Sequence, residues 1–395
     1  ISTSYLLGRY SKPEWGQKDS KRKRLVATGV VALFVLMSVV VGLAWGFGVE
    51  DPRTFRGFVI PVLVGVSLTS GLAQIWASTQ QGRHQHWLLV GNRQELEVLR
   101  QELAREAVPQ HLQLQFRDCG VLGGTAVAPD DSVDGIAVSE TAALDDALLE
   151  ELLALRAKGI GICSLVVWSE LHLQRVPPEL FSSRWLVQAE GFELQPGRWG
   201  WRVKRLADVI VASLLLLALL PLFPILALLI RIEDGGKIFY GQERTGLYGE
   251  KIRIWKFRTM TEEKSGKRAR WAERADVRIT RIGHWLRKLR LDELPQLVSV
   301  LTGEMSLIGP RPEQPELELA LEEQIPHYRV RHWIRPGLSG WAQVCYRYGA
   351  SAEDSRMKLC YDIYYLRNVN LLLDILITIK TVKMLMHAQG AIPKS

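Results

Sequence analysis

The sequence predicts a membrane-anchored α/β protein that begins with transmembrane helices, continues with a doubly wound αβ module and ends in a mostly helical domain. Three observations predict this class. The stretches 25–49 and 57–79 carry no charged residue, short apolar runs alternate with amphipathic ones between residues 81 and 200, and a third apolar stretch at 209–230 contains two prolines. The 395 residues are 47% hydrophobic and 23% charged, which excludes a disordered or collagen-like chain and suggests two or three domains.

The two charge-free stretches are long enough to span a bilayer. They hold 25 and 23 residues, and a transmembrane helix needs about 20. Basic residues cluster directly ahead of the first stretch, so residues 1–24 are expected in the cytoplasm, and two helices within 25–80 bring the chain back to that side. Buried helices of a soluble core are the alternative. Because the sequence begins at Ile1 rather than Met, we expect further residues upstream; the first stretch is too long for a cleavable signal peptide.

Residues 81–200 are predicted to form the αβ module. Strands separated by helices pair in parallel, which gives a doubly wound sheet. The turn after the first strand reads Gly91-Asn92-Arg93 and lacks the G-x-G-x-x-G pattern of a dinucleotide-binding turn. A scaffold or regulatory role is therefore favoured over a nucleotide site. The expected strands are 86–90, 112–116, 135–138 and 160–167, and the expected helices are 93–107 and 143–158.

The third apolar stretch is predicted to enter the membrane and return to the same side. Pro221 and Pro224 lie just past its middle, and proline breaks a helix because it lacks the N–H donor and collides with the preceding turn. Basic residues on both flanks favour two cytoplasmic ends. A break at Leu220-Pro221 would give a re-entrant helix at about 206–231. A kinked but complete span is the alternative, and it would place the rest of the chain outside.

A strongly basic block, residues 251–290, follows this segment. It contains fourteen Lys or Arg and four Asp or Glu, a net charge of +10, whereas the whole chain carries +8. Anionic lipid or a polyphosphate would suit such a block beside a membrane, and without a nucleic-acid-binding motif we expect no nucleic acid partner. Lys256 and Arg258 alternate on one face of a predicted strand, which suits a diphosphate, although a solvated strand face is an equal alternative.

Two adjacent carboxylates follow a predicted helix at 282–289. Asp292 and Glu293 precede Pro295, which is best tolerated in a first helical turn, so Asp292 is predicted to be an N-cap. A helix N-terminus and the surrounding guanidinium groups would keep both carboxylates ionised. The pair could then supply a nucleophile that attacks phosphorus and ligands for Mg²⁺. The alternative is that Asp292 only caps the helix.

The segment Gly309-Pro310-Arg311-Pro312 presents one arginine between two prolines. The prolines fix the backbone, and the planar guanidinium of Arg311 matches phosphate oxygens. Phosphate binding and a plain turn are both compatible with this pattern.

Six ordered motifs in the C-terminal half resemble the bacterial sugar transferase family. They cover about residues 201–385 and read KRLADVIVASLLLLALLPLFPILALLIRI, GQERTGLYGEKIRIWKFRTM, RITRIGHWLRKLRLDELPQL, GEMSLIGPRPE, IRPGLSGWAQV and YDIYYLRN. Members of this family are monotopic polyprenyl-phosphate phosphoglycosyl transferases, and the αβ module is similar to the Rossmann-like region of their long form. The resemblance implies a catalytic domain at 201–395 that contains the re-entrant helix, preceded by a Rossmann-like module at 81–200.

The resemblance also implies a reaction. A sugar 1-phosphate would pass from a UDP-sugar to a polyprenyl phosphate, usually undecaprenyl phosphate, with release of UMP. This would be the first step of exopolysaccharide, capsule or O-antigen assembly, at the cytoplasmic face of the bacterial inner membrane and in contact with its lipids. Four cysteines outside any disulfide or zinc spacing fit that reducing side. A homodimer formed through the αβ module is a further expectation.

Roles for single residues follow from the matching motifs. In the family the Asp of the pair, here Asp292, forms a covalent phosphosugar intermediate, and the Glu, here Glu293, serves Mg²⁺ or the second transfer; how the two divide these roles stays open. The family's phosphate-binding residues match Lys256, Arg258, Arg287 and Arg311, its helix break matches Pro221, and a carboxylate of open role matches Asp362.

Such a reaction needs a site at the membrane surface, because a lipid phosphate and a nucleotide sugar can meet only there, and a re-entrant helix provides that placement. The apolar face of 371–383 predicts an interfacial helix. Interfacial anchoring and ordinary core packing both explain five tryptophans of this half, namely Trp255, Trp271, Trp285, Trp333 and Trp341.

Two rival functions are compatible with the sequence. One is a membrane-tethered nucleotide-sensing or partner-docking protein of the polysaccharide machinery. The other is a conventional glycosyltransferase, which would leave UDP instead of UMP, so the nucleotide product separates the two reactions.

Overall fold

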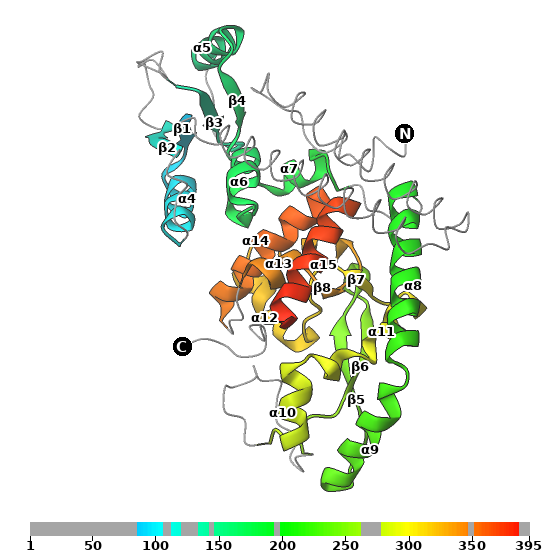
Figure 1. Ribbon diagram of the computed structural model, residues 1–395. Coiled ribbons are helices and arrows are strands. Elements are labelled where there is room, and N and C mark those ends of the chain that lie inside the picture. Colours follow the sequence, from blue (N-terminus) through cyan, green and yellow to red (C-terminus); the bar gives the residue numbers. More distant parts are fainter. Residues whose placement is uncertain are drawn as a thin grey trace, which may run out of the picture. The chain divides into compact units, whose positions relative to one another are not determined.

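The computed structural model describes residues 85–105, 112–119, 133–141, 146–192, 198–261, 278–346 and 351–386 (Figure 1). The predicted segment 1–24, the two predicted membrane stretches and Trp271 lie outside these residues. By their contacts, the residues form two compact units that divide between Leu165 and Val166. The sequence groups residues 166–192 with the αβ module, whereas their contacts place them in the second unit.

The first unit contains a four-stranded parallel sheet. The strand order is β2-β1-β3-β4, and every neighbouring pair is parallel, as the alternation of strands and helices predicts. Leu88, Val90, Ile136 and Val138 form its core with residues of α5. The elements are β1 (Gln85–Gly91), α4 (Arg93–Arg105), β2 (Leu112–Asp118), β3 (Gly135–Val138), α5 (Asp146–Ala157) and β4 (Gly161–Ser164).

The last strand of this sheet is shorter than the sequence predicts. β4 ends at Ser164, and Leu165 begins helix α6 (Leu165–Leu173). Leu165, Val166 and Trp168 are fully buried. The apolar run therefore continues past Ser164 because a buried helix follows the strand. A short apolar run does not distinguish these two structures.

The second unit is mostly helical, as predicted. Its described strands form two small sheets, the antiparallel pair β5–β6 and the parallel pair β7–β8. After α6 come α7 (Ser183–Gln188), α8 (Trp199–Leu219), α9 (Leu222–Asp234), β5 (Phe239–Thr245), β6 (Lys251–Phe257), α10 (Arg281–Lys288), α11 (Gln296–Thr302), β7 (Ser306–Ile308), α12 (Pro315–Gln324), β8 (Gly337–Ser339), α13 (Trp341–Cys345), α14 (Ala352–Asn368) and α15 (Leu371–Met386). Short 3₁₀ turns are η2 (Pro178–Leu180), η3 (Leu247–Gly249), η4 (Leu291–Glu293) and η5 (Tyr328–Trp333).

Helices α8 and α9 bend by 60° where the chain passes Leu220 and Pro221 (Figure 1). Among the described helices none is long and apolar enough to cross a membrane alone, whereas this bent pair meets both criteria together. Both helices expose large apolar side chains, including Leu214, Leu217, Leu228 and Ile232. The pair therefore has the break and the surface that the sequence predicts for residues 206–231.

Helix α15 is apolar on two sides. Leu373 and Ile377 are buried, while Leu372, Ile375 and Ile379 are about half exposed. The helix thus packs on the unit with one face and presents a second apolar face outward.

Four of the tryptophans predicted as interfacial anchors lie among the described residues, and they fall into two groups. Trp341 is buried and stacks on Tyr364, so it belongs to the core. Trp255, Trp285 and Trp333 are 42%, 61% and 36% exposed, which leaves their role as interfacial anchors a prediction.

Strand β6 joins two hydrophobic clusters and so positions the elements around it. Its Ile254 packs with residues of α8 and α11, including Val300. Its Phe257 packs with residues of α9 and α10, including Ile230 and Leu286. The end of β6 and the turn between α10 and α11 are thereby held close together.

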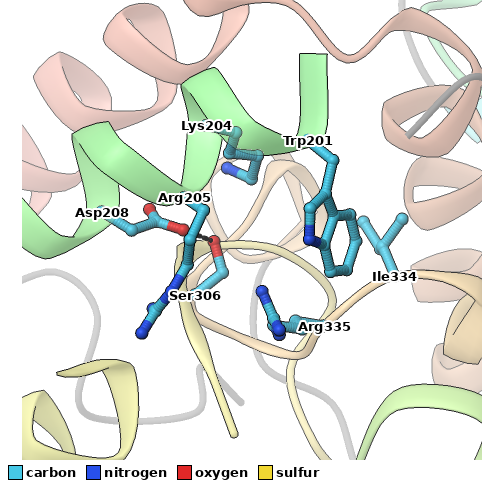
Figure 2. Close-up of a pocket in the computed structure, with 7 residues that line it drawn as sticks. All are labelled: Trp201, Lys204, Arg205, Asp208, Ser306, Ile334 and Arg335. Atoms are coloured by element: carbon cyan, nitrogen blue, oxygen red, sulfur yellow. Dashed lines mark hydrogen bonds between the residues drawn. The ribbon is translucent and has the colours of Figure 1, made fainter. Parts of the chain in front are cut away.

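Polar contacts fasten the first half of α8 to its surroundings (Figure 2). Arg205 donates to two carbonyl groups in the last turn of α11, where a cation is favourable. Asp208 accepts a hydrogen bond of 2.8 Å from the Ser306 hydroxyl, drawn dashed in Figure 2. Lys204 pairs with Asp374 of α15 at 2.7 Å. These contacts join α8, α11, β7 and α15 into one body.

Candidate active site

Asp292 and Glu293 lie in a tight turn between α10 and α11. Arg290 has a φ of 56°, a left-handed conformation that is uncommon outside glycine, and η4 follows directly. The N-cap of α11 is Pro295, so the prediction that Asp292 caps this helix is wrong. The chain already turns at Arg290, and the two carboxylates consequently lie inside the turn that leads into α11.

Three cations surround the Glu293 carboxylate. Its Oε1 accepts hydrogen bonds from Lys256 at 2.9 Å and from Arg311 at 2.8 Å, and its Oε2 accepts one from Arg290 at 3.3 Å. Burial acts to raise the pKa of Glu293, but Arg311, Lys256 and Arg290 outweigh it and hold that pKa well below its usual value. Glu293 is therefore a fixed anion that gathers cations beside Asp292.

The Asp292 carboxylate has a different environment. The residue is buried, and none of the described residues donates a hydrogen bond to its side chain. Burial raises the pKa of Asp292 and the neighbouring Glu293 charge raises it further, while Lys256, Arg287 and Arg311 act in the opposite direction. The oxygens of Asp292 thus accept no hydrogen bond from the described residues, while three nearby cations act against the rise in its pKa.

Lys256 and Arg258 contact different carboxylates. Lys256, whose pKa is lowered by burial, lies on Glu293. β6 ends at Phe257, so the strand alternation that predicts a shared face does not reach Arg258. The buried Arg258 pairs instead with Asp234 at the end of α9.

Arg287 and Arg311 lie on either side of the acidic pair. Arg287, in the last turn of α10, donates from its Nε to the Thr259 hydroxyl at 2.8 Å and acts on Asp292 through its charge. Arg311 reaches Glu293 from the loop after β7, and its side chain is 36% exposed. Together with Lys256 they form a cationic surround for the pair, suited to phosphate oxygens.

Asp362 lies in the middle of α14 and is 1% exposed. It pairs with Arg331 of η5, with 3.0 Å between Oδ2 and Nη2. Burial raises the pKa of Asp362 to about 6, against the opposing charge of Arg331. Among the described contacts, none joins Asp362 to the acidic pair.

Sequence reasoning assigned no role to three arginines near the site. Arg290 supports Glu293 directly, and Arg244 and Arg331 hold the loop that carries Arg311. Arg244 lies in the GQERT motif and Arg290 immediately precedes Leu-Asp-Glu, so both had a local signal. Arg331 had none.

The pair fits a magnesium ion only in part. Mg²⁺ is commonly bound by one or two carboxylates together with substrate phosphates and water. Asp292 can supply one such carboxylate, whereas both oxygens of Glu293 are engaged by cations. Within the described residues there is no cluster of three or more carboxylate, histidine or cysteine side chains that could hold a metal without substrate.

In the αβ module, the place where a dinucleotide phosphate would bind is filled by the chain itself. Glu95 in the first turn of α4 accepts from the backbone N–H of Asn92 at 3.1 Å, and Asn92 accepts from the N–H of Glu95 at 2.9 Å. Ser139 and Thr141 also donate their hydroxyls to Glu95, at 2.8 and 2.7 Å. A buried carboxylate here repels a phosphate, which favours the scaffold or regulatory interpretation.

The comparisons with known proteins define the class. The model of the bacterial sugar transferase family matches residues 199–388, the part of the chain that contains α8 to α15 and the acidic pair. This chain belongs to that family.

Three relatives carry the names of sugar phosphotransferases that act on undecaprenyl phosphate. The UDP-N-acetylgalactosamine-undecaprenyl-phosphate N-acetylgalactosaminephosphotransferase of Aeromonas hydrophila is 43% identical over 189 residues, which are 48% of this chain and 45% of that protein. The UDP-glucose:undecaprenyl-phosphate glucose-1-phosphate transferases of Escherichia coli and Caulobacter vibrioides are 36% and 40% identical, over 46% and 48% of this chain and 39% and 71% of those proteins. The chain thus spans less than half the length of the first two.

Proposed function

We propose that this protein transfers a sugar 1-phosphate from a UDP-sugar to undecaprenyl phosphate and releases UMP, as the first step of exopolysaccharide, capsule or O-antigen assembly. One observation carries the proposal: Asp292 is buried among cations and accepts no hydrogen bond from the described residues, beside a Glu293 that is fully engaged. Family membership and the names of the relatives support the same reaction.

In the first transfer, a carboxylate oxygen of Asp292 attacks the phosphorus that carries the sugar. A bond forms between that oxygen and phosphorus, the phosphorus–oxygen bond to the second phosphate breaks, and UMP leaves with the electron pair. Lys256, Arg287 and Arg311 are placed to stabilise the negative charge of the diphosphate as it redistributes. Asp292 is thereby the nucleophile, and Glu293 orders the cations.

In the second transfer, an oxygen of undecaprenyl phosphate attacks the phosphorus bound to Asp292. The bond to the carboxylate breaks, its electron pair returns to Asp292, and the lipid diphosphate sugar is released. A phosphate monoester has its second pKa near about 6, so the attacking oxygen is already ionised at neutral pH. Glu293, whose pKa lies well below its usual value, need not accept a proton.

Mg²⁺ is part of this proposal. Asp292 and the phosphates of the donor would hold it, and it would neutralise part of the diphosphate charge when bound. UMP release is accordingly expected to cease when the metal is removed with a chelator and to return when Mg²⁺ is added.

The covalent step is tested without lipid acceptor. The purified chain is incubated with Mg²⁺ and UDP-glucose, UDP-galactose or UDP-N-acetylgalactosamine, each labelled in its sugar. With the correct sugar we expect about one UMP per active site and label bound to the protein, and neither with D292N. The exposed control E304Q should behave like the wild type. A preparation that releases UMP only when lipid is present, and never becomes labelled, contradicts the covalent route.

We further propose that the catalytic unit lies at the cytoplasmic face of the inner membrane, with α8 and α9 entering one leaflet and returning. Their 60° bend and exposed apolar side chains support this placement. The test replaces the four cysteines and introduces E353C, at a side chain that is 51% exposed. An impermeant maleimide should label inside-out vesicles and detergent-opened cells. Labelling of intact spheroplasts would contradict the proposal.

A further inference from the structure

The loop 309–313, which carries Arg311, is fixed along its backbone. Three of its backbone groups are bonded to β8 and to the end of β5. These hydrogen bonds are Gly309 N–H to Ser339 O at 2.8 Å, Gly337 N–H to Pro310 O at 2.9 Å, and Thr245 N–H to Glu313 O at 3.0 Å. The loop is therefore held near both of its ends.

Two arginines hold the carbonyl groups in the middle of this loop. Arg331 donates from Nη2 to the carbonyl of Arg311 at 3.0 Å, and Arg244 donates from Nη1 to the carbonyl of Pro312 at 3.3 Å. Arg331 is only 3% exposed. Every carbonyl from Pro310 to Glu313 thus has a donor, and the Arg311 side chain projects from a fixed backbone onto Glu293.

Each of these arginines has further partners, and Arg331 meets Asp362 with the same Nη2 that binds the loop. Arg331 lies 3.0 Å from the Oδ2 of Asp362 and donates to the Tyr328 hydroxyl. Arg244 donates to Gln242 at 2.8 Å. Among the described contacts, Asp362 reaches the loop only through Arg331.

Three glycines allow the loop to lie directly against β8. Gly309, Gly337 and Gly340 bring the loop and β8 together backbone on backbone, and a β-carbon on any of them would collide with the opposing chain. The loop cannot move closer to β8, and the arginines hold the two carbonyl groups, of Arg311 and Pro312, that the neighbouring strands do not bind.

We infer that Asp362 and Arg331 are positioning residues: they hold the backbone of Arg311 so that its guanidinium reaches Glu293, and Arg244 holds the same loop through the next carbonyl. The contact of Arg311 with a donor phosphate rests on the proposed function, whereas its contact with Glu293 does not. Without the Asp362 charge, Arg331 would lose its buried ion-pair partner, and the Nη2 that binds the Arg311 carbonyl would no longer be fixed from that side.

A double-mutant cycle tests this chain of contacts. The rate of UMP release is measured for the wild type, D362N, R311A and D362N/R311A. Since a displacement of about 1 Å costs up to about a hundredfold in rate, D362N should lower kcat about tenfold to a hundredfold. In the R311A background D362N should cost nothing further, because it acts through Arg311. Equal losses in both backgrounds would overturn the inference.

A matched control separates positioning from stability. Glu170, also buried, pairs with Arg367 of helix α14, which also carries Asp362, at 3.0 Å, and none of the described contacts joins Glu170 to the loop. E170Q should lower Tm and leave kcat of the folded enzyme unchanged. If D362N does not fold, R331K replaces it in the cycle. Lysine keeps the charge but lacks the fork with which Arg331 binds the Tyr328 hydroxyl through Nη1 while its Nη2 meets Asp362 and the Arg311 carbonyl.

A second cycle needs no turnover, so its outcome is independent of the proposed function. The thermal stabilities of R311A, E293Q and R311A/E293Q give the coupling between Arg311 and Glu293, first in the wild type and then with R331K present. We expect the coupling to fall by at least half when R331K is present. An unchanged coupling would show that Arg331 does not position Arg311, even if UMP release is absent for every donor.

Discussion

Each unit buries a carboxylate near the start of a helix, and the two are treated differently. In the αβ module, Glu95 accepts hydrogen bonds from two hydroxyls and a backbone N–H, all of them neutral donors of the same unit. In the second unit, Glu293 is held by three cations, while Asp292 accepts no hydrogen bond from the described residues. The first carboxylate is a helix cap, whereas at the second place one carboxylate gathers the cations and its neighbour is left without a hydrogen bond from the described residues.

Burial does not distinguish Glu95 from Asp292, since both are buried, whereas their hydrogen-bond partners do. The position of Glu95 alone would suggest a ligand site, because ligands often bind at the edge of a parallel sheet beside a helix N-terminus. There the carboxylate of Glu95 takes the place of a ligand phosphate. At the turn before α11, Glu293 binds Lys256, Arg290 and Arg311 directly. Two of these cations, Lys256 and Arg311, act on the neighbouring Asp292 through their charge.

The largest effect is expected from E293Q, which removes the anion that sets the environment of Glu293 apart from that of Glu95. A neutral amide cannot hold Lys256, Arg290 and Arg311 together, so we expect UMP release to fall about a hundredfold. The folded pKa of Glu293 lies below its usual 4.5, so its stabilisation is complete above that value and is lost as the pH falls toward the folded pKa. E293Q should therefore lower Tm at pH 7, and the difference from the wild type should shrink below about pH 4.

The exposed E304Q serves as the control for both measurements, because it removes a negative charge from the loop that follows α11 without touching the cations. Turnover of E293Q at the wild-type rate would contradict the proposal that the cations held by Glu293 take part in the reaction. A Tm difference that stays constant with pH would mean that Glu293 is not stabilised as an anion.

The smallest effect on activity is expected from E95Q, which changes the corresponding carboxylate of the αβ module. A glutamine offers one acceptor oxygen in place of two, so at least one buried donor loses its partner, at a cost of about 1–3 kcal/mol. We expect a lower urea midpoint for the αβ module and unchanged UMP release by the folded enzyme.

S139A provides the matched variant, because it removes one of the donors and leaves the carboxylate in place. It should destabilise the module less than E95Q does. A change in UMP release with E95Q at full folding, or nucleotide binding to the wild-type module that E95Q alters, would assign Glu95 a functional role.

Hydropathy and spacing predict much of the fold because they report burial directly. The parallel strands at 86–90 and 135–138 are confirmed, and the chain breaks at Pro221 where proline demands it. The prediction of a strand at 160–167 is wrong after Ser164, where a helix begins. A buried helix and a buried strand both require apolar residues. Periodicity over eight residues does not separate these cases.

The site is predictable where its residues are adjacent in the chain. Asp292 and Glu293 stand together, but the roles of Lys256 and Arg311 depend on contacts across 37 and 18 positions. Arg258 resembles Lys256 in sequence, yet it pairs with another carboxylate because the strand has ended. Arg331 lacks any local signal, since its importance arises from packing between α14 and the loop.

Arg290 is subject to two opposing demands. Its left-handed backbone favours glycine, whereas the ion pair with Glu293 requires a long cationic side chain. No residue type meets both demands, so relieving the backbone would weaken the charge network, and keeping the charge preserves the strain. This position therefore trades folding stability against the electrostatic order of the site, as expected where strain is retained for function.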